Sequence, residues 1–357
     1  MTADAVGGVW QYSVDLANEL AGRGREVMLA VLGPPPSAEQ KVQLNPSIHL
    51  AGGDFALEWM DNAWHDVDCS QEWLLAMERE FQPSIIHLNG YALASAPWQA
   101  PVVSVAHSCV YSWWHAVHSC SPDAGWREYE RRVSRGLQSA AAVAAPSQFM
   151  ADEIVRHYGV SRGKASVIPN FSLARIPSPA VKEPFILAAG RMWDQAKNLS
   201  LLESIADQVD WPLHIAGSDQ PKGATDLSSP RYLGKLTHQT LLDRMAAASI
   251  FVHPALYEPF GLAVLEAAKA KCCLVLADIP SLRELWDGAA LFVDPHEGQQ
   301  WIRQLNKLIG DPSERDRLAA RAFSHSARYD AKLSVSLYLD IYDRCLRSNR
   351  AGNGAAA

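Results

Sequence analysis

Short apolar runs alternate with segments of helical periodicity along most of the chain. Within residues 9–22, for example, Tyr12, Leu16 and Leu20 recur at helical spacing. Apolar runs predict strands at 26–31, 84–88, 102–106, 142–145, 165–168, 213–216 and 249–252, and a further strand from 185. Periodicity and caps predict helices at 9–22, 71–80, 123–138, 147–157, 198–209, 238–247, 297–309 and about 313–346. This alternation indicates an α/β fold with doubly wound parallel sheets, in which ligands bind beyond the carboxyl ends of the strands.

Composition narrows the class of protein. The 357 residues, 48% hydrophobic and 20% charged, are typical of a globular protein long enough for two domains. A net charge of −7 argues against a nucleic-acid partner. The six cysteines show neither zinc spacing nor a disulfide framework, which predicts reduced thiols in a cytosol. No apolar run reaches the length of about 18 residues that a membrane span needs, so membrane contact could only be peripheral. Residues 45–69 are irregular in composition, and no element is assigned to them.

The most informative stretch is 251–266, Phe-Val-His-Pro-Ala-Leu-Tyr-Glu-Pro-Phe-Gly-Leu-Ala-Val-Leu-Glu. A buried strand should end at His253, and a helix should open near Phe260 with Pro259 at its first position. Glycine lets a ligand approach the backbone closely, and free amides at a helix start bind anions. The amides concerned belong to Phe260, Gly261 and Leu262, and the flanking carboxylates to Glu258 and Glu266. A diphosphate held between two carboxylates that bind hydroxyls indicates a nucleotide-sugar site. The alternative is an ordinary strand–turn–helix with two solvated acids.

Two further segments offer groups for an anion. Arg191 and Lys197 follow the strand that starts at 185 and open the next helix, where two cations would complement a diphosphate. Gly7 and Gly8 precede the helix 9–22, at a point where a phosphate or sugar could approach the backbone. The alternatives are surface cations for the first pair and a plain turn for the second.

Candidate residues for catalysis and for acceptor binding lie in the first half of the chain. His107 and Asn170 each follow a predicted strand, although such a histidine could simply be hydrogen-bonded in a loop. Trp113, Trp114 and His115 belong to an aromatic stretch whose flat faces suit sugar rings or lipid tails, or which is a packed helix. Arginines share one face of the helix 123–138, either as a solvated face or as a site for an anionic membrane or phosphorylated acceptor. These are Arg127, Arg131, Arg132 and Arg135.

The motif Glu-Pro-Phe-Gly-Leu-x-x-x-Glu resembles the signature of the retaining, family-four nucleotide-sugar glycosyltransferases with the GT-B fold. Other segments resemble parts of the same family: the glycines at 7–8, the junction Val-Ile-Pro-Asn at 167–170, the Arg191–Lys197 pair and the segment 231–236. In this family the first glutamate lies beside the donor sugar, the Phe-Gly-Leu amides meet the sugar and diphosphate, and the second glutamate binds ribose. The segment that includes Leu236 touches the nucleobase through its backbone.

The resemblance implies a hexosyltransferase-type enzyme that moves a sugar from a nucleoside diphosphate sugar to a hydroxyl of a glycan, a glycolipid or a small molecule. Glu258, His107, Arg191 and Lys197 would serve catalysis, with the two cations neutralising the leaving group without a metal or other cofactor. UDP, GDP and ADP are not distinguished, nor are the sugar, the acceptor or the oligomeric state. Polysaccharide or glycoconjugate biosynthesis in the cytoplasm, open to peripheral contact with the inner membrane face, is the implied setting.

The resemblance also implies two Rossmann-like domains. Residues 1–175 would bind the acceptor, 176–329 the donor, and a helix at about 330–348 would pack back on the first domain. The prolines of 172–184 mark the linker, and 349–357 should be a disordered tail.

The sequence departs from the family pattern at two places. The first strand is cut to Thr2–Ala5, so that it is very short or the start codon lies upstream, and Lys271-Cys272-Cys273 replaces the usual Gly-x-Pro. A nucleotide-sugar-binding protein without transferase activity, a sugar-nucleotide epimerase and a phosphorylase are the alternative functions.

Overall fold

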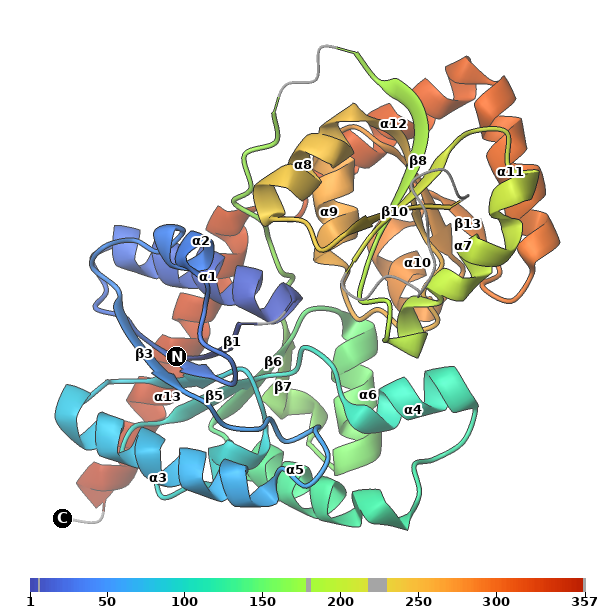
Figure 1. Cartoon of the computed structure of the whole chain (residues 1–357). Coiled ribbons are helices and arrows are strands. Elements are labelled where there is room, and N and C mark those ends of the chain that lie inside the picture. The colour runs from blue at the N-terminus through green and yellow to red at the C-terminus, as the bar shows by residue number, and fades with distance from the viewer. Residues whose placement is uncertain (6, 178–180, 218–229, 356–357) are drawn as a thin grey trace. The chain divides into compact units, whose positions relative to one another are not determined.

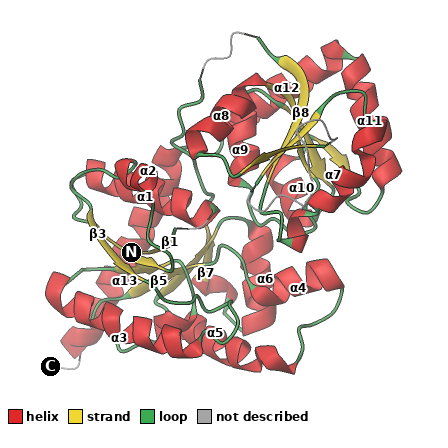
Figure 2. Cartoon of the chain, viewed as in Figure 1, coloured by secondary structure: helices red, strands yellow, loops and turns green. Residues whose placement is uncertain are grey.

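The computed structural model describes residues 1–5, 7–177, 181–217 and 230–355, with side chains to Ala351. The chain forms two compact units. Unit 1 comprises Met1–His115, Cys120–Ser172 and Ala331–Ala357, and unit 2 comprises Ala116–Ser119 and Leu173–Asp330. Both are α/β units with parallel sheets (Figures 1 and 2). The predicted fold class is therefore confirmed.

Unit 1 contains two parallel sheets, ordered β1-β2-β3 and β4-β5-β6-β7. Their strands are β1 (Thr2–Asp4), β2 (Met28–Leu32), β3 (His49–Gly53), β4 (Ile86–Leu88), β5 (Val102–Val105), β6 (Ala142–Ala145) and β7 (Ala165–Val167). The helices are α1 (Gly8–Gly22), α2 (Ala38–Val42), α3 (Trp64–Phe81), α4 (Val110–His118), α5 (Arg127–Ser139), α6 (Gln148–Tyr158) and α13 (Ala331–Ala355). Asn89 joins the two sheets, because its backbone N–H donates to Thr2 Oγ1 over 2.9 Å and its Nδ2 to the Thr2 carbonyl over 2.7 Å.

Unit 2 is built on one six-stranded parallel sheet ordered β10-β9-β8-β11-β12-β13. The strands are β8 (Glu183–Ala189), β9 (Leu213–Ala216), β10 (Arg231–Gly234), β11 (Ala248–His253), β12 (Cys273–Ala277) and β13 (Leu291–Val293). The helices are α7 (Leu199–Ile205), α8 (His238–Ala247), α9 (Leu262–Lys269), α10 (Pro280–Trp286), α11 (Gly298–Gly310) and α12 (Pro312–Ser326). Strands β11 and β12 are buried throughout, as expected of a parallel sheet covered by helices on both faces. The strand order reverses between β8 and β11, the point at which open parallel sheets bind ligands.

Several element bounds differ from the sequence-based prediction. The helix of the acidic motif (residues 258–266) begins at Leu262 and not near Phe260, so Pro259 lies outside it. The reason is Gly261, whose φ of 83° is left-handed and cannot belong to a right-handed helix. The predicted helix 313–346 is two helices, because Tyr329 in the intervening turn anchors its hydroxyl on the Leu285 carbonyl of unit 2.

Three other segments were predicted incompletely. The unassigned segment 45–69 contains β3 and the first turns of α3. The predicted helix 198–209 divides into α7 and the 3₁₀ turn Ala206–Gln208. Helix α13 continues to Ala355, whereas a disordered tail was expected for 349–357; it does so although Gly352 and Gly354 have low helix propensity, and 356–357 lie outside the described residues. No described helix has the length and apolar character needed to cross a bilayer.

Helix α13 is held to unit 1 by a buried polar cluster. Its apolar positions Val335 and Ile341 are buried at helical spacing with two tyrosines. The Tyr12 hydroxyl of α1 donates to the Tyr338 hydroxyl over 2.6 Å. The ring nitrogen Nδ1 of His87 lies 2.7 Å from the Tyr342 hydroxyl. Since unpaired polar groups are costly inside a protein, this cluster specifies how α13 packs.

We expect this cluster to make the fold sensitive to acid. Burial lowers the pKa of His87 to about 3, whereas an unfolded histidine titrates near 6.5. Between these values the unfolded chain binds more protons, so the free energy of unfolding falls as pH drops below about 6.5, by roughly 1.4 kcal/mol per pH unit. Urea titrations of the full chain at pH 7 and pH 5 measure this loss. His87→Gln should show a smaller loss over the same range; equal losses in both proteins would contradict the prediction.

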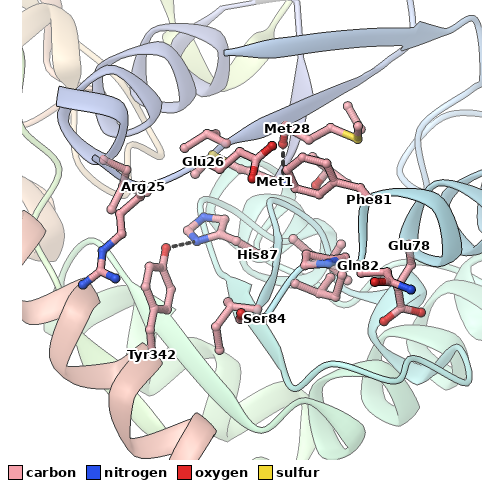
Figure 3. A pocket seen from close by; sticks show the side chains of 18 of the residues that line it. Met1, Arg25, Glu26, Met28, Glu78, Phe81, Gln82, Ser84, His87 and Tyr342 are labelled. Carbon is pink, nitrogen blue, oxygen red and sulfur yellow. Dashed lines mark hydrogen bonds between the residues drawn. The ribbon is translucent and has the colours of Figure 1, made fainter. Parts of the chain in front are cut away.

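A cavity of about 420 Å³ lies beneath this cluster in unit 1. It lies at the amino ends of β2 and β4, where Met28 and Ile86 line it. Met1 and Met28 are seen in its wall in Figure 3. His87 and Tyr342 also border it. The cavity therefore lies at the amino ends of these strands. Ligands of α/β proteins bind at the carboxyl ends, which are at the opposite edge.

Candidate functional site

In unit 2 the structure brings Lys197 and Glu258 into direct contact. Lys197 ends the 3₁₀ turn Gln195–Lys197 that follows β8, and Glu258 lies in the loop that follows β11. The Lys197 Nζ and Glu258 Oε2 atoms are 2.7 Å apart. The side chain of Lys197 is 16% exposed to solvent, and that of Glu258 is 14% exposed. Because β8 and β11 are adjacent and parallel, this ion pair lies at the carboxyl edge where the strand order reverses.

The same carboxylate oxygen of Glu258 has a second partner. The Nε2 atom of His253, the last residue of β11, lies 3.1 Å from Glu258 Oε2. Burial alone would raise the pKa of the Glu258 carboxyl. The charge of Lys197 and the hydrogen bonds from His253 and Lys197 outweigh burial and hold that pKa well below its usual range. Glu258 is therefore ionised at every physiological pH.

Arg191, two residues beyond β8, pairs with a different carboxylate, that of Asp194. Its Nη2 donates to Asp194 Oδ2 over 2.6 Å, and its guanidinium carbon lies 5.0 Å from the centre of the Trp193 ring. The side chain is 40% exposed. Asp194 also accepts from the Ala196 N–H over 3.1 Å, which ties the arginine to the turn that presents Lys197.

At the start of α9, the groups that could bind a ligand are backbone amides and not side chains. Phe260 is buried, with its ring 5.3 Å from that of Tyr329, so only its backbone is available to a ligand. A Cβ on Gly261 would lie 3.0 Å from Val264, in addition to being strained by the positive φ. The amide of Leu265 already donates to the Gly261 carbonyl. The amides of the three residues before it, 262–264, have no acceptor within α9 and form the start of the helix.

Glu266 is buried within α9 and has a histidine partner. Its Oε1 lies 2.8 Å from Nε2 of His238, and its side chain keeps only 5% of its exposure. His238 is the first residue of α8, just after the Thr237 cap. Leu236, the predicted base-contacting residue, is half-buried in the segment between β10 and this cap.

Neither histidine was among the sequence candidates. His253 lies five residues before Glu258 and could have been considered because it ends a strand. His238 lies 28 residues from Glu266, so no local spacing could have revealed their contact.

The candidates of unit 1 lie at the carboxyl side of its sheets. Gly7 caps α1 with a φ of 76°, and Gly8 is the first residue of that helix. His107 Nε2 lies 2.9 Å from Asn89 Oδ1, and its ring meets the Tyr12 ring edge-on at 4.5 Å. Burial lowers the pKa of His107 to about 3, so the ring is neutral at physiological pH. In the catalytic role predicted for it, His107 would therefore act through a neutral ring.

Asn170 follows β7 and is buried, and among the described residues its Oδ1 has no hydrogen-bond partner. Trp113 and Trp114 are half-buried in α4, with their rings 6.0 Å apart, while His115 is exposed. Trp114 also lies 6.1 Å from Trp126. These contacts give the aromatic stretch a packing role, and its binding of an acceptor stays a prediction.

The basic face of α5 is largely neutralised by its own surroundings. Arg131 and Arg132 both pair with Glu128, over 2.6 and 2.7 Å, and Arg132 also pairs with Asp68. This arrangement favours a solvated, ion-paired helix over a site for an anionic surface.

The expectation that no metal is needed overlooked an Asp-x-Asp run at 66–68. Asp66 and Asp68 lie in the first turns of α3, and residues two apart on a helix point in different directions. Asp66 accepts from the Ala56 N–H over 2.9 Å, and Asp68 pairs with Arg132. Both carboxylates thus have structural partners.

Comparisons with known proteins cover both halves of the chain. Residues 6–171 match Glycosyltransferase Family 4, and residues 173–325 match Glycosyl transferases group 1. A D-inositol 3-phosphate glycosyltransferase from Streptomyces avermitilis is 25% identical over 98% of this chain and 85% of its own length.

Two solved structures show the fold. Sucrose-phosphate synthase from Thermosynechococcus elongatus aligns with a TM-score of 0.79 at 17% identity, over 97% of this chain and 95% of its own. Alr3699/HepE from Anabaena, in complex with UDP-glucose, aligns with a TM-score of 0.70 at 18% identity, over 98% and 100% of the two chains. At these identities the likeness concerns the fold alone.

Proposed function

Because the chain belongs to the family-four glycosyltransferases with the GT-B fold, we propose that it moves a sugar from a nucleoside diphosphate sugar to a hydroxyl acceptor with retention of anomeric configuration. The acceptor would be a carbohydrate or a lipid-linked carbohydrate in polysaccharide or glycoconjugate biosynthesis. The observation that carries the proposal is the Lys197–Glu258 pair at the carboxyl edge between β8 and β11. A solved neighbour that holds UDP-glucose adds support for the nucleotide-sugar donor.

The donor diphosphate would bind at the start of α9. Its charge would be met by Arg191 and Lys197 and by the amides at the helix start. As the bond to the leaving phosphate lengthens, negative charge grows on the phosphate oxygens, and groups already aimed at that position stabilise it without rearrangement. The charge comes from side chains and backbone, so we expect no divalent metal to be required.

Glu258 would act on the sugar. Its carboxylate is ionised, and Oε2 contacts both Lys197 and His253. A fixed negative charge beside the sugar positions its hydroxyls and stabilises the positive charge that develops at the anomeric carbon. Retention can proceed through a covalent carboxylate intermediate or by attack on the same face as departure. We propose the second route, in which a leaving-phosphate oxygen takes the proton of the acceptor hydroxyl.

Nucleotide binding tests the proposal directly. We expect one of UDP, GDP, ADP and dTDP to bind in isothermal titration with EDTA present, and to raise the melting temperature by mass action. Glu266→Ala should weaken that binding at least tenfold, because it removes the proposed partner of the ribose hydroxyls. The matched control is Asp287→Ala, whose carboxylate is 78% exposed in unit 2. If no nucleotide binds, the transferase proposal is wrong; binding that EDTA abolishes contradicts metal independence.

Turnover separates the remaining alternatives. Release of nucleoside diphosphate from its sugar conjugate in the presence of an acceptor supports a transferase. Tight nucleotide binding without any turnover would instead indicate a binding protein.

A further inference from the structure

Each glutamate of the acidic motif is held by a histidine from a different element. His253, at the end of β11, lies 3.1 Å from Glu258 Oε2, and His238, at the start of α8, lies 2.8 Å from Glu266 Oε1. In both pairs the histidine uses Nε2. The four side chains all lie in unit 2.

The direction of these hydrogen bonds follows from the chemistry of the groups. A carboxylate only accepts, so the Nε2 atom of each ring must carry the hydrogen. The two histidines differ in burial, since the His238 side chain is 25% exposed. The His253 side chain is only 4% exposed, and its ring is nearly parallel to that of Phe251, at an angle of 15°. His238 follows Thr237, whose side chain caps α8 through the Thr240 N–H.

We propose that His253 and His238 are positioning residues, one for the sugar-facing glutamate and the other for the ribose-binding glutamate. This inference rests on the proposed function.

For Glu258, the second partner matters when the donor arrives. In the structure both Lys197 and His253 contact Glu258 Oε2, and among the described residues Oε1 makes no hydrogen bond. A diphosphate would draw the Lys197 ammonium away from the carboxylate, because both anions compete for it. His253 would then keep Oε2 in place and leave Oε1 directed at the sugar. Its loss should therefore slow the chemical step and leave nucleotide binding intact.

For Glu266, the histidine links two segments that would surround the nucleoside. His238 is the first residue of α8, directly after the segment that follows β10, and Glu266 belongs to α9. A carboxylate that is oriented before the ligand arrives does not lose side-chain freedom on binding, which improves affinity. Loss of His238 should therefore weaken binding of the nucleotide itself, whichever sugar it carries.

The experiment compares His253→Leu and His238→Leu with the wild type. The probes are the free nucleoside diphosphate that binds the wild type best and the corresponding sugar nucleotide. We expect His238→Leu to raise the Kd of the free nucleotide about tenfold and the donor KM in parallel, with kcat within threefold of wild type. We expect His253→Leu to lower kcat about tenfold or more and leave the Kd of the free nucleotide within threefold.

Conservative variants separate positioning from folding. Glutamine carries an N–H donor at a similar reach to histidine Nε2, so His253→Gln and His238→Gln should recover most of the lost function. His214→Leu is the matched control, since His214 is a buried histidine of β9 in the same unit and contacts neither glutamate. We expect its Kd and kcat to match the wild type.

The outcomes are distinguishable. If the wild type binds no nucleoside diphosphate, the proposed function is wrong and this inference falls with it. If the wild type binds and turns over while both leucine variants behave like it, only the positioning roles are refuted. Identical losses in Kd and kcat for both variants, without rescue by glutamine, would also refute them.

Discussion

Lys197→Met is expected to lower kcat/KM for sugar transfer by about 10²- to 10³-fold, the effect of removing one preorganised charge-stabilising group. The variant removes the cation proposed to meet the leaving phosphate and also the partner of Glu258, 2.7 Å away. A partly buried carboxylate without its counter-charge destabilises the fold, here by about 2 kcal/mol, less than for a fully buried pair. Donor consumption and urea unfolding measure the two effects separately.

The double variant Lys197→Met/Glu258→Gln distinguishes loss of chemistry from loss of stability. Replacing the carboxylate by a neutral amide removes the uncompensated charge, so much of the lost stability should return. Activity should not return, because neither proposed group is then present. Near wild-type turnover in the single variant would contradict the assigned role of Lys197.

Gly136→Ala is expected to destabilise unit 1 by about 3 kcal/mol or more, since overpacking against an immobile backbone has no inexpensive relief. Gly136 lies within α5, and a Cβ there would stand 1.9 Å from the Tyr91 carbonyl oxygen and 2.7 Å from its carbon. That backbone is firmly held, because the Glu58 carboxylate accepts from the amides of Tyr91 and Ala92. Urea unfolding measures the loss.

The matched control is Gly22→Ala. Gly22 also lies in a helix, as the last residue of α1, but a Cβ there meets nothing within 4 Å. We expect this variant to be as stable as the wild type or slightly more so, because alanine has less freedom to lose on folding. Equal stability of the two alanine variants would show that α5 can move away from Tyr91.

Local chemistry explains which elements the sequence could predict. Ser147 caps α6 as expected, accepting from the Met150 N–H over 3.2 Å. Three predicted elements are confirmed residue for residue: the strands 142–145 and 213–216 and the helix 238–247. The start of α9 was predicted too early because the sequence does not show that Gly261 has a positive φ, which excludes it from the helix.

Contacts between distant segments account for what could not be predicted. The ion pair of Lys197 with Glu258 was not predicted: family resemblance placed both residues at the donor site, but 61 residues separate them and no local pattern indicates their contact. Nothing near Glu266 pointed to His238, and nothing near His87 pointed to the tyrosines of α13. Such partners meet only in the folded protein, because the pairing of strands brings the ends of distant segments together at one edge of the sheet.

The place of α13 in unit 1 bears on how the protein is made. The helix that contributes Tyr338 and Tyr342 to the buried cluster is synthesised after all of unit 2. On the ribosome, unit 2 therefore has its whole sequence available while the earlier-made unit 1 still exposes the surface of Tyr12 and His87. A nascent chain whose translation stalls before residue 331 would expose the surface of Tyr12 and His87 to chaperones and proteases. A stall late in translation would thus leave the part of the protein that is made first incomplete.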